Sequence, residues 1–510
     1  MLQKIKQWGD KPLSMKVMYV FLFAMIGFYL LEALLCKVYD SDMYFLIATG
    51  REILENGIPH VNVWSIDMQS GFVAQQWLYT IFMALADKIG HIGFTLLVAV
   101  QFVILLVLLN HFFNLKKVSK GVKLVCISVV VFYSQMYLFS TRPETITMIL
   151  LLVECIALEH YKTSNKWQWL LLLPFTMLLE MNLHASMWPI HYAILLAYLV
   201  PAFYLPGVKE ISMHKQWKPI ALFTLIMTGI MFVNPYGFDG IMYIIRSFKA
   251  DTFSYISIKE ITPPTFISAC GLTILLSFIL IFVNHKLKTL TSTALNITLG
   301  FVALSMTASR HNMFSIFIMA FLLRDLAESI TSVVKVDIKK DVKKGILPVL
   351  IVGVMFFGLS CVGSVSSVFL DEQSSGLDNM YEYINKSYTD ETRVFTGFNN
   401  GAYFEWKGFK NLYIDARPEL YTDDFTGDKH ILADYSRYCI YGFSTVESSK
   451  KLFVTSDEMN EWFYSYDFDY VVVSPFAEQN LYSYMLYNKD YRVVDECKSD
   501  TYILYEKINK

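Results

Sequence analysis

The sequence has little charge for its length. Only 17% of its 510 residues are charged and 55% are hydrophobic, whereas about a quarter of the residues in an average soluble domain are charged. We therefore expect a membrane protein. The charge that is present divides unevenly, since residues 371–510 hold 14 Lys and Arg against 25 Asp and Glu. Because the C-terminal part lacks the basic surface that nucleic acid requires, no nucleic-acid partner is expected.

The sequence also lacks the motifs of several large protein classes. Its seven cysteines include no C-x-x-C pair, and five lie in or next to apolar segments, which excludes a disulfide framework and leaves only Cys439 and Cys497 as a conceivable pair. No G-x-G-x-x-G, G-x-x-x-x-G-K-[ST], H-E-x-x-H or G-x-S-x-G motif occurs, so nothing indicates a soluble nucleotide site, an ATPase, a zinc protease or a serine hydrolase. The sequence thus offers no site for a soluble activated donor. A sugar carried by a membrane lipid would serve as the donor instead.

Long apolar runs fill the first 370 residues. A transmembrane helix needs about 20 mostly apolar residues, and the runs predict about eleven such helices. The first follows four lysines but lacks a cleavage site, so it is expected to remain as an anchor. The predicted spans are 17–37, 93–113, 122–140, 145–160, 168–182, 187–204, 219–233, 266–284, 290–308, 313–327 and 346–366.

The distribution of basic residues predicts the orientation. With the N-terminus in the cytoplasm, the inner segments carry 21 Lys and Arg, Arg324 among them, and the outer loops before residue 371 carry eight. The chain is thus expected to be a multi-pass cell-membrane protein whose C-terminal domain is extracytoplasmic. Residues 75–90 are too short to span and predict an interfacial helix in the outer loop 38–92, with Trp77 and Tyr79 at the level of the lipid headgroups.

Polar residues gather at the outer ends of the predicted spans. Ionisable groups at membrane depth are costly and usually face a cavity or a partner, so we expect one outward-opening polar cavity. The candidate residues for this cavity are Asp40, Asp42, Arg142, Glu144, Glu180, Asn182, His184, Asn234, Tyr236, Glu260, Arg310, His311 and Asn312.

Each of these motifs also has a structural interpretation. Asp40 and Asp42 lie two residues apart, so on an extended segment they would share a face and could bind one hard cation, yet they could equally form a solvated turn or a helix cap. The segment 141–144 is typical of a helix start with Thr141 as the cap, whereas Arg142 also suits a phosphate group. Asn234 lies in an ordinary turn sequence.

The remaining candidates also have both a functional and a structural interpretation. Glu180 and His184 share one face of a helix, where they form either a functional pair or a buried hydrogen-bonded one. Glu260 precedes a span that it could simply cap. Residues 310–312 join two apolar segments, and a tight hairpin would explain their polarity but not the choice of Arg and His.

Together these motifs resemble those of a family of bacterial polytopic membrane proteins, the GT-C-like glycosyltransferases. The resemblance rests on the segments 40–42, 76–78, 142–144, 182–184, 234–237 and 310–312, with Gly50, Pro59 and Ser65. In the C-terminal part, residues 398–403 and 412–417 are similar to the "Gly-Gly-Tyr … Ile-Asp-Gly-Arg" element of that family. The chain departs from the family pattern at Leu46 and Ala48, where relatives tend to have His and Arg, and at Gln76, where they tend to have Glu.

The resemblance implies an inverting transferase that moves a sugar from a polyprenyl-phosphate carrier to a glycan, lipid or protein acceptor at the outer face. Asp40 or Asp42 would then act as the general base or bind a metal, Mg²⁺ or Mn²⁺. Glu180 and His184 are further catalytic candidates that would orient the acceptor with Asn182. The group that would hold the donor phosphate is Arg142, Arg310 and His311, with Glu144, Asn234, Tyr236, Glu260 and Asn312 lining the substrate site.

The pattern changes after residue 370. Short aromatic and β-branched runs predict strands at 393–397, 402–406, 411–414, 470–474, 491–495 and 501–505, and helices at 377–387 and 456–466. We therefore predict two domains: a GT-C-like transmembrane domain at 1–370 and an extracytoplasmic α/β domain at 371–510. Within the latter, Asp415 and Arg417 are expected to form a structural ion pair or the edge of an acceptor site.

Two other functions are compatible with the sequence. The departures at Leu46, Ala48 and Gln76 leave a non-catalytic scaffold for envelope assembly as an alternative. A carrier of lipid-linked glycans is the other, although carriers often show internal repeats and two-sided polar residues. Here no repeat is evident and the polar groups lie on one side, which favours the enzyme.

Overall fold

The computed structural model describes residues 41–66, 71–138, 141–202, 205–249, 262–265, 267–333, 373–427, 429–440 and 454–508. They form two compact units. The first, the bundle unit, comprises the described residues within Gly90–Val233 and Lys259–Phe369; the second, the mixed unit, comprises the described residues within Lys37–Ile89, Asn234–Ile258 and Leu370–Lys510. The sequence predicted that the outer loop 38–92 belongs to the domain 1–370. In the structure, the described residues of this loop up to Ile89 pack in the same unit as the C-terminal residues.

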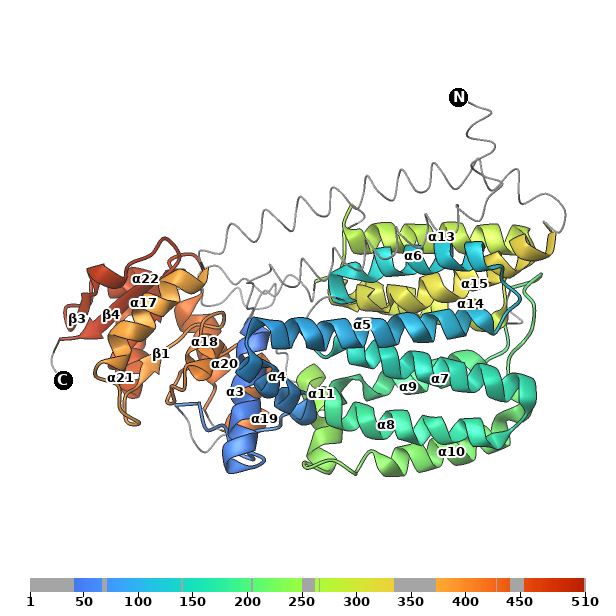
Figure 1. Ribbon diagram of the computed structural model, residues 1–510. Helices are drawn as coiled ribbons and strands as arrows, with labels where there is room; N and C mark the ends of the chain where they lie inside the picture. The colour runs from blue at the N-terminus through green and yellow to red at the C-terminus, as the bar shows by residue number, and fades with distance from the viewer. Residues whose placement is uncertain are drawn as a thin grey trace. The chain divides into compact units, whose positions relative to one another are not determined.

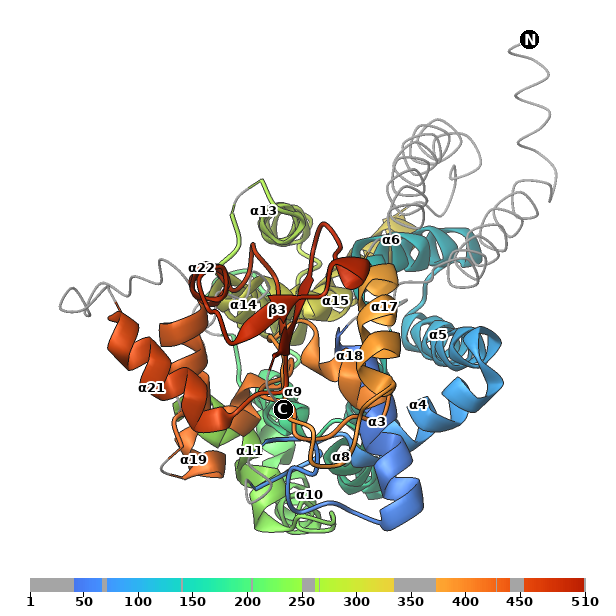
Figure 2. The ribbon, with the colours of Figure 1, turned by 90° about the vertical axis from the view of Figure 1, so that its left-hand side faces the viewer.

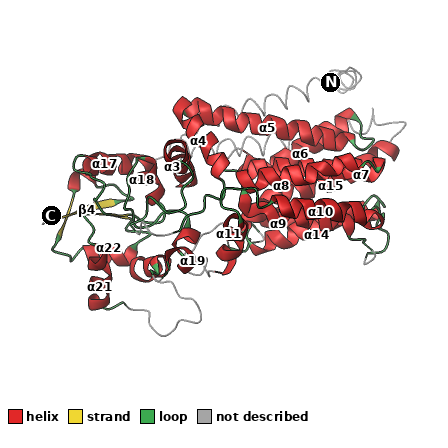
Figure 3. Ribbon diagram, turned by 90° about the horizontal axis from the view of Figure 1, so that it is seen from below, coloured by secondary structure: helices red, strands yellow, loops and turns green. Residues whose placement is uncertain are grey.

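The described part of the bundle unit consists mainly of long helices that lie side by side (Figures 1 and 3). It contains α5 (His91–Asn114), α6 (Lys120–Leu138), α7 (Glu144–Ser164), η1 (Trp167–Leu171), α8 (Leu172–Leu183), η2 (Ala185–Met187), α9 (Trp188–Leu199), η3 (His214–Gln216), α10 (Trp217–Ile230), α13 (Ala269–Lys286), α14 (Ser292–Thr307), η5 (Ser309–Phe314) and α15 (Ser315–Val333).

These helices match the predicted spans between residues 93 and 327 closely. The spans 17–37 and 346–366 lie outside the described residues. The helix predicted for 187–204 ends at Leu199, because Val200 precedes Pro201 and takes an extended conformation that a residue before proline favours. Helix α7 begins at Glu144 with Pro143 at the N-cap position and no side-chain cap, so Thr141 is not its cap.

Two described helices, α5 and α13, are long and apolar enough to cross a membrane, and the helical segments 185–199, 217–230 and 292–307 are apolar but shorter. Helices α7 and α15 carry buried ionisable side chains. Arg324, which we counted in an inner loop, instead lies inside α15 with no exposed surface, beside Glu159 of α7 at 3.2 Å and over the rings of Phe112 and Phe321. Arg324 therefore belongs to the packed interior and not to the loop charges.

The N-terminal part of the mixed unit is a pair of packed helices, α3 (Ser41–Asn56) and α4 (Trp77–Ile89). Their close approach depends on Gly50, since a Cβ atom there would lie 1.9 Å from the carbonyl oxygen of Thr80. Helix α4 confirms the helix predicted for 75–90. Tyr79 of this helix is fully buried by other protein groups, and its expected place at the level of the lipid headgroups stays a prediction. The segment after residue 233 adds α11 (Phe238–Lys249) to this unit.

A four-stranded sheet forms the C-terminal part of the mixed unit. Its strands are β1 (Val394–Phe395), β2 (Tyr470–Val473), β3 (Tyr491–Val493) and β4 (Ile503–Lys507), in the order β1-β2-β4-β3. Strand β1 is parallel to β2, and the other pairs are antiparallel. In Figure 2 the strands lie between α17 (Gln373–Asn385) and the helices α21 (Ser456–Tyr466) and α22 (Gln479–Met485).

Successive side chains of β2 point to opposite faces of the sheet, which explains this layered arrangement. Val471 and Val473 belong to the core that also contains Trp462 of α21 and Met485 of α22. Tyr470 points to the other face, where its ring meets that of Tyr383 in α17.

Two of the six predicted strands are wrong. Residues 402–406 form α18 (Gly401–Trp406), and residues 411–414 form only isolated bridges from Leu412 to Ser65 and Val394. Aromatic residues favour strands, but here Tyr403 and Phe404 are buried within a helix, so tertiary packing decides the conformation. Cys439 and Cys497 are both buried free thiols.

Candidate functional site

Glu180 and His184, both candidate catalytic residues, lie together in the bundle unit. The hydroxyl of Thr147 in α7 links them, with its Oγ1 atom 2.6 Å from Glu180 Oε1 and 2.8 Å from His184 Nδ1. The two side chains are therefore buried and linked through Thr147, which the motifs did not include, and this arrangement is compatible with both interpretations given for the pair.

The same group extends deeper into the bundle. The second oxygen of Glu180 lies 3.2 Å from His191 Nε2, and His191 Nδ1 lies 2.5 Å from Glu154 Oε2. Thr147, Glu154, Glu180 and His191 have no exposed surface, whereas 4% of His184 is exposed. We call these five residues the polar chain.

A sequence signal for the polar chain exists. Glu154 and His191 are ionisable residues inside predicted spans, where such groups are rare and usually functional. Thr147 and Glu154 are seven residues apart, which places them on one face of α7. The motif search missed these residues because it considered only the ends of the spans.

The other candidates of the bundle unit have mixed surroundings. Arg142 is half-buried in the turn before α7, and Glu144 lies in the first turn of α7, where a carboxylate suits the helix dipole. Arg310 in η5 interacts electrostatically with His184.

Asn182 and His311 make hydrogen bonds to backbone carbonyl groups, whereas Asn312 has none through its Oδ1 atom among the described residues. Asn182 donates to the carbonyl oxygens of Leu178 and Val233 at 2.7 and 2.9 Å. His311 Nδ1 lies 2.9 Å from the carbonyl oxygen of Leu304 at the end of α14. Asn312 is buried, and its Oδ1 atom has no hydrogen-bond partner among the described residues.

The expected metal ligands belong to the mixed unit. Asp40 and Glu260 lie outside the described residues. Asp42 lies in the first turn of α3 and not on an extended segment, so its environment is that of an acidic residue at a helix N-terminus. Across the described ranges, no three His, Cys, Asp or Glu side chains gather as a metal site. A Mg²⁺ or Mn²⁺ site at Asp40 and Asp42 therefore stays a prediction.

Asn234 and Tyr236 fold as the turn that their sequence indicates. Asn234 accepts from the backbone amide of Tyr236 at 2.9 Å and donates to the carbonyl oxygen of Gly237 at 3.1 Å. The Tyr236 hydroxyl donates to the carbonyl oxygen of Pro59 at 3.0 Å, which fastens this turn to the first outer loop within the mixed unit.

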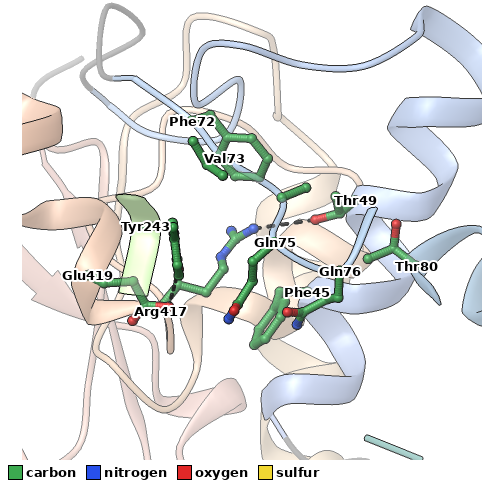
Figure 4. Close-up of a pocket in the computed structure, with 11 residues that line it drawn as sticks. Phe45, Thr49, Phe72, Val73, Gln75, Gln76, Thr80, Tyr243, Arg417 and Glu419 are labelled. Carbon is green, nitrogen blue, oxygen red and sulfur yellow. Dashed lines mark hydrogen bonds between the residues drawn. The ribbon is translucent and has the colours of Figure 1, made fainter. Parts of the chain in front are cut away.

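A pocket of about 300 Å³ lies within the mixed unit (Figure 4). Helices α3, α4 and α11 contribute to its wall, as do the segment before α4 and the residues around Arg417. Most of this space is open to solvent, and only about 30 Å³ can hold the centre of a water-sized group, so the pocket fits a small polar group and not a whole ligand. It is lined by Phe45, Thr49, Phe72, Val73, Ala74, Gln75, Gln76, Thr80, Tyr243, Arg417 and Glu419.

Arg417 is held rigidly in this wall. It makes two hydrogen bonds to Asp415, at 2.9 Å from Nε and 2.7 Å from Nη2, and a third to Glu405 at 2.5 Å. Its Nη1 atom reaches Thr49 Oγ1 at 3.4 Å (Figure 4). The guanidinium also lies 5.0 Å from the centre of the Phe45 ring. The ion pair expected between Asp415 and Arg417 is therefore present, and Arg417 also lines the pocket.

The charge of Arg417 is balanced locally. Burial alone would raise the pKa of Asp415, but Arg417 and the hydrogen bond from Tyr421 outweigh it and hold that pKa below its usual value. Burial raises the pKa of Glu405 well above its usual value. Because two acidic groups surround one guanidinium, the pocket has no surplus positive charge with which to bind a phosphate.

The pocket does offer groups that suit hydroxyls. The Oε1 atoms of Gln75 and Gln76 are buried and have no hydrogen-bond partner among the described residues. Tyr243 donates to Glu419, and the rings of Phe45 and Phe72 provide apolar surface. Buried amide oxygens without a partner are costly, so a ligand hydroxyl that donates to them would be favoured.

Sequence analysis identified only part of this pocket. Gln76 and the segment 412–417 belong to the motifs on which the family resemblance rests, so motif reading found two of its walls. Thr49 and Tyr243 carried no signal, because a single hydroxyl in a helix is unremarkable until its neighbours in space are known.

The described residues define the class of the protein as one that combines a bundle of long helices with a mixed α/β unit. No protein-family model and no curated protein matches the chain. Among solved structures it is similar to ArnT from Cupriavidus metallidurans, in the crystal structure bound to undecaprenyl phosphate, with a TM-score of 0.58 and 11% identity. The match covers 96% of this chain and 98% of ArnT, so the two proteins share an overall fold.

Proposed function

We propose that this protein is a glycosyltransferase that takes a sugar from a polyprenyl-phosphate carrier and passes it to an acceptor at the outer face of the membrane. The observation that carries the proposal is the fold shared with ArnT over nearly all of both chains. ArnT was crystallised with undecaprenyl phosphate, a lipid of the class that the family resemblance implies as the carrier.

The chemistry requires three functions. A cationic group must stabilise the phosphate that leaves, a base must take the proton of the acceptor hydroxyl, and a polar site must orient the sugar or the acceptor. We assign the first to Arg142 and Arg310, the two arginine candidates of the bundle unit, and the second to Asp40 or Asp42. Mg²⁺ or Mn²⁺ held by these carboxylates would supply further charge stabilisation.

The pocket of the mixed unit is our candidate for the third function. Its balanced charge favours an uncharged hydroxylated group over a phosphate, and its amide oxygens can accept hydrogen bonds from hydroxyls. The sugar or a sugar-like part of the acceptor has this chemistry. The family resemblance implies that Glu180 and His184 orient the acceptor, but their burial in the polar chain favours a role in proton handling instead.

The test is a transfer assay with the purified full-length protein in lipid nanodiscs. Synthetic polyprenyl-phosphate sugars would be incubated with glycan, lipid and peptide acceptors, and the release of polyprenyl phosphate would be measured. We expect release that depends on an acceptor, and we expect Asp42→Asn and Gln76→Leu to reduce it. Gln479→Leu is the matched control, since Gln479 is exposed on α22 and does not line the pocket.

A non-catalytic scaffold is the second candidate. It is favoured by Gln76, a neutral residue in the pocket wall at the position where the family tends to have Glu. A scaffold would bind polyprenyl phosphate sugars without releasing the phosphate in the presence of any acceptor. A carrier would move labelled lipid-linked glycan across a liposome membrane with its bond intact.

A further inference from the structure

The polar chain contains more hydrogen-bond acceptors than ordinary protonation states can satisfy. A neutral imidazole has one N–H and one lone pair, but both ring nitrogens of His191 face carboxylate oxygens, at 2.5 Å to Glu154 and 3.2 Å to Glu180. With two ionised carboxylates and a neutral His191, a nitrogen lone pair would point at an oxygen lone pair. The group must therefore hold one additional proton.

We propose that the polar chain is a buried proton acceptor in which His191 is an imidazolium between the carboxylates of Glu154 and Glu180. In this state the three side chains have a net charge of −1. One further proton on Glu180 would make them neutral, which a buried, low-dielectric site favours. The three groups therefore titrate as one unit.

The geometry also provides a route for that proton. His184 is the member of the polar chain with exposed surface, and its Nδ1 atom lies 2.8 Å from the Thr147 hydroxyl, which in turn lies 2.6 Å from Glu180. When a proton binds His184 Nε2, the Nδ1–H bond can break as a new O–H bond forms on Thr147. The original hydroxyl proton then moves to Glu180 Oε1, and His184 is neutral again.

Other polar groups next to the polar chain affect this balance. Cys155 and Tyr192 interact electrostatically with Glu154, and Arg310 interacts with His184. The positive charge of Arg310 disfavours a lasting charge on His184, so a proton arriving there is expected to move inward. The Oε1 atom of Glu154 is buried without a hydrogen-bond partner among the described residues, which marks the inner end of the polar chain.

The link to catalysis rests on the proposed function. Transfer of a sugar from a polyprenyl-phosphate sugar to a hydroxyl forms the new glycosidic C–O bond, breaks the bond from the sugar to the phosphate oxygen, and releases the acceptor proton with polyprenyl phosphate. The polar chain can take up a proton of this reaction that reaches His184. Thr147 and Glu180 are then proton-handling residues that do not need to touch the substrate.

The experiment measures the proton directly, so it does not depend on enzyme activity. Full-length protein with ¹⁵N-labelled histidine in nanodiscs would be studied by solid-state NMR at pH 7, with His191→Gln to assign the signals. We expect both ring nitrogens of His191 to carry a proton. A His191 ring with only one protonated nitrogen would overturn the proposal.

Exchange into D₂O tests the route. Thr147→Val removes the linking hydroxyl, and we expect it to slow exchange of the His191 N–H protons by at least about tenfold. Thr147→Ser restores the hydroxyl and should restore the rate. Thr176→Val is the matched control, because Thr176 is equally buried in the bundle but donates to the Leu173 carbonyl outside the polar chain.

The outcomes separate the two proposals. Unchanged exchange in Thr147→Val would show that Thr147 is only a structural link and would overturn the route. Slowed exchange in a protein that transfers no sugar would support the polar chain and contradict the proposed function. In an active protein, Thr147→Val should lower kcat with KM unchanged, and Thr147→Ser should rescue kcat.

Discussion

At the scale of single residues, Arg417 shows how a pocket wall can be rigid without a net charge. Its guanidinium satisfies Asp415 and Glu405 at once, and all three are almost completely buried. Removing one member of such a group leaves the others without compensation, which costs more than the intact pairing contributes.

We therefore predict that Arg417→Ala destabilises the mixed unit by about 3–5 kcal/mol, measured as a fall in the unfolding temperature of the purified protein. Arg417→Lys should recover only part of this loss, because an ammonium cannot form the bidentate contact to Asp415. The control is Arg437→Ala, which removes an exposed ion pair to Glu458 and should change stability by less than about 1 kcal/mol. Equal effects of the two alanine variants would contradict this view of Arg417.

Glu478 gives a prediction about pH. Burial raises its pKa to about 7, against hydrogen bonds from Tyr435 and the amide of Ser474 that lower it. Because the folded state binds this proton more tightly than the unfolded state, its contribution to stability is fully present below the unfolded pKa of about 4.5 and is lost as pH rises through 7. This loss amounts to about 3 kcal/mol.

Unfolding temperatures measured between pH 5 and pH 8 would check this prediction. Glu478→Gln cannot titrate, so its stability should vary less over this range than that of the unchanged protein. A variant with the same pH dependence as the unchanged protein would assign the effect to other groups.

At the scale of elements, the contact between α3 and α4 depends on glycine at position 50, which has no side chain. A Cβ atom at residue 50 would lie 1.9 Å from the Thr80 carbonyl oxygen and 2.9 Å from the Ala84 side chain, both in α4. Since α3 carries Phe45 and Thr49 and α4 carries Thr80, the spacing of these helices also sets the width of the pocket.

We predict that Gly50→Ala destabilises the protein by about 1–3 kcal/mol, the usual cost of overpacking, and lowers ligand affinity at the pocket. Gly300→Ala is the matched control. Gly300 lies inside α14 with nothing within 4 Å of its would-be Cβ, so alanine there should add about 0.5–1 kcal/mol of stability. Thermal unfolding of the two variants should therefore shift in opposite directions.

Helix α21 shows how well local sequence signals work where they are strong. Its bounds are those predicted, and Thr455 and Glu458 form a reciprocal capping box. We expect Thr455→Ala to cost about 1 kcal/mol and Thr455→Ser to cost little, as measured by thermal unfolding. An unchanged unfolding temperature in Thr455→Ala would show that packing alone holds this helix.

The same comparison explains where sequence analysis failed. Long apolar runs predicted the bundle helices, whereas residues 402–406 were misassigned because aromatic residues suit both strands and buried helices. The polar chain and the pocket depend on side chains from different segments, such as Thr49 and Arg417, which meet only after folding. Neither the spacing of residues nor the composition predicts such contacts between distant segments.

At the scale of the whole molecule, the predicted topology can be tested with single cysteines. Lys117 follows α5 and Asp424 lies in α19 (Asp423–Thr426), and both are exposed. We expect Lys117→Cys to react with a membrane-impermeant maleimide only after the membrane is opened, and Asp424→Cys to react in intact cells. The native cysteines of the described segments are buried, which keeps the background low. Labelling of Lys117→Cys in intact cells would reverse the predicted orientation.

The composition of the mixed unit has a consequence for biosynthesis. Its pocket combines residues as early as Phe45 with residues as late as Glu419, while the bundle helices are encoded between them. The ribosome therefore synthesises most of the bundle before the last residues that line the pocket. Until then, α3 and α4 lack their contacts with the C-terminal residues of the mixed unit. A nascent chain that stops before residue 419 would expose apolar surface of this unit, which makes the late segment a natural checkpoint for proteases that remove unfinished chains.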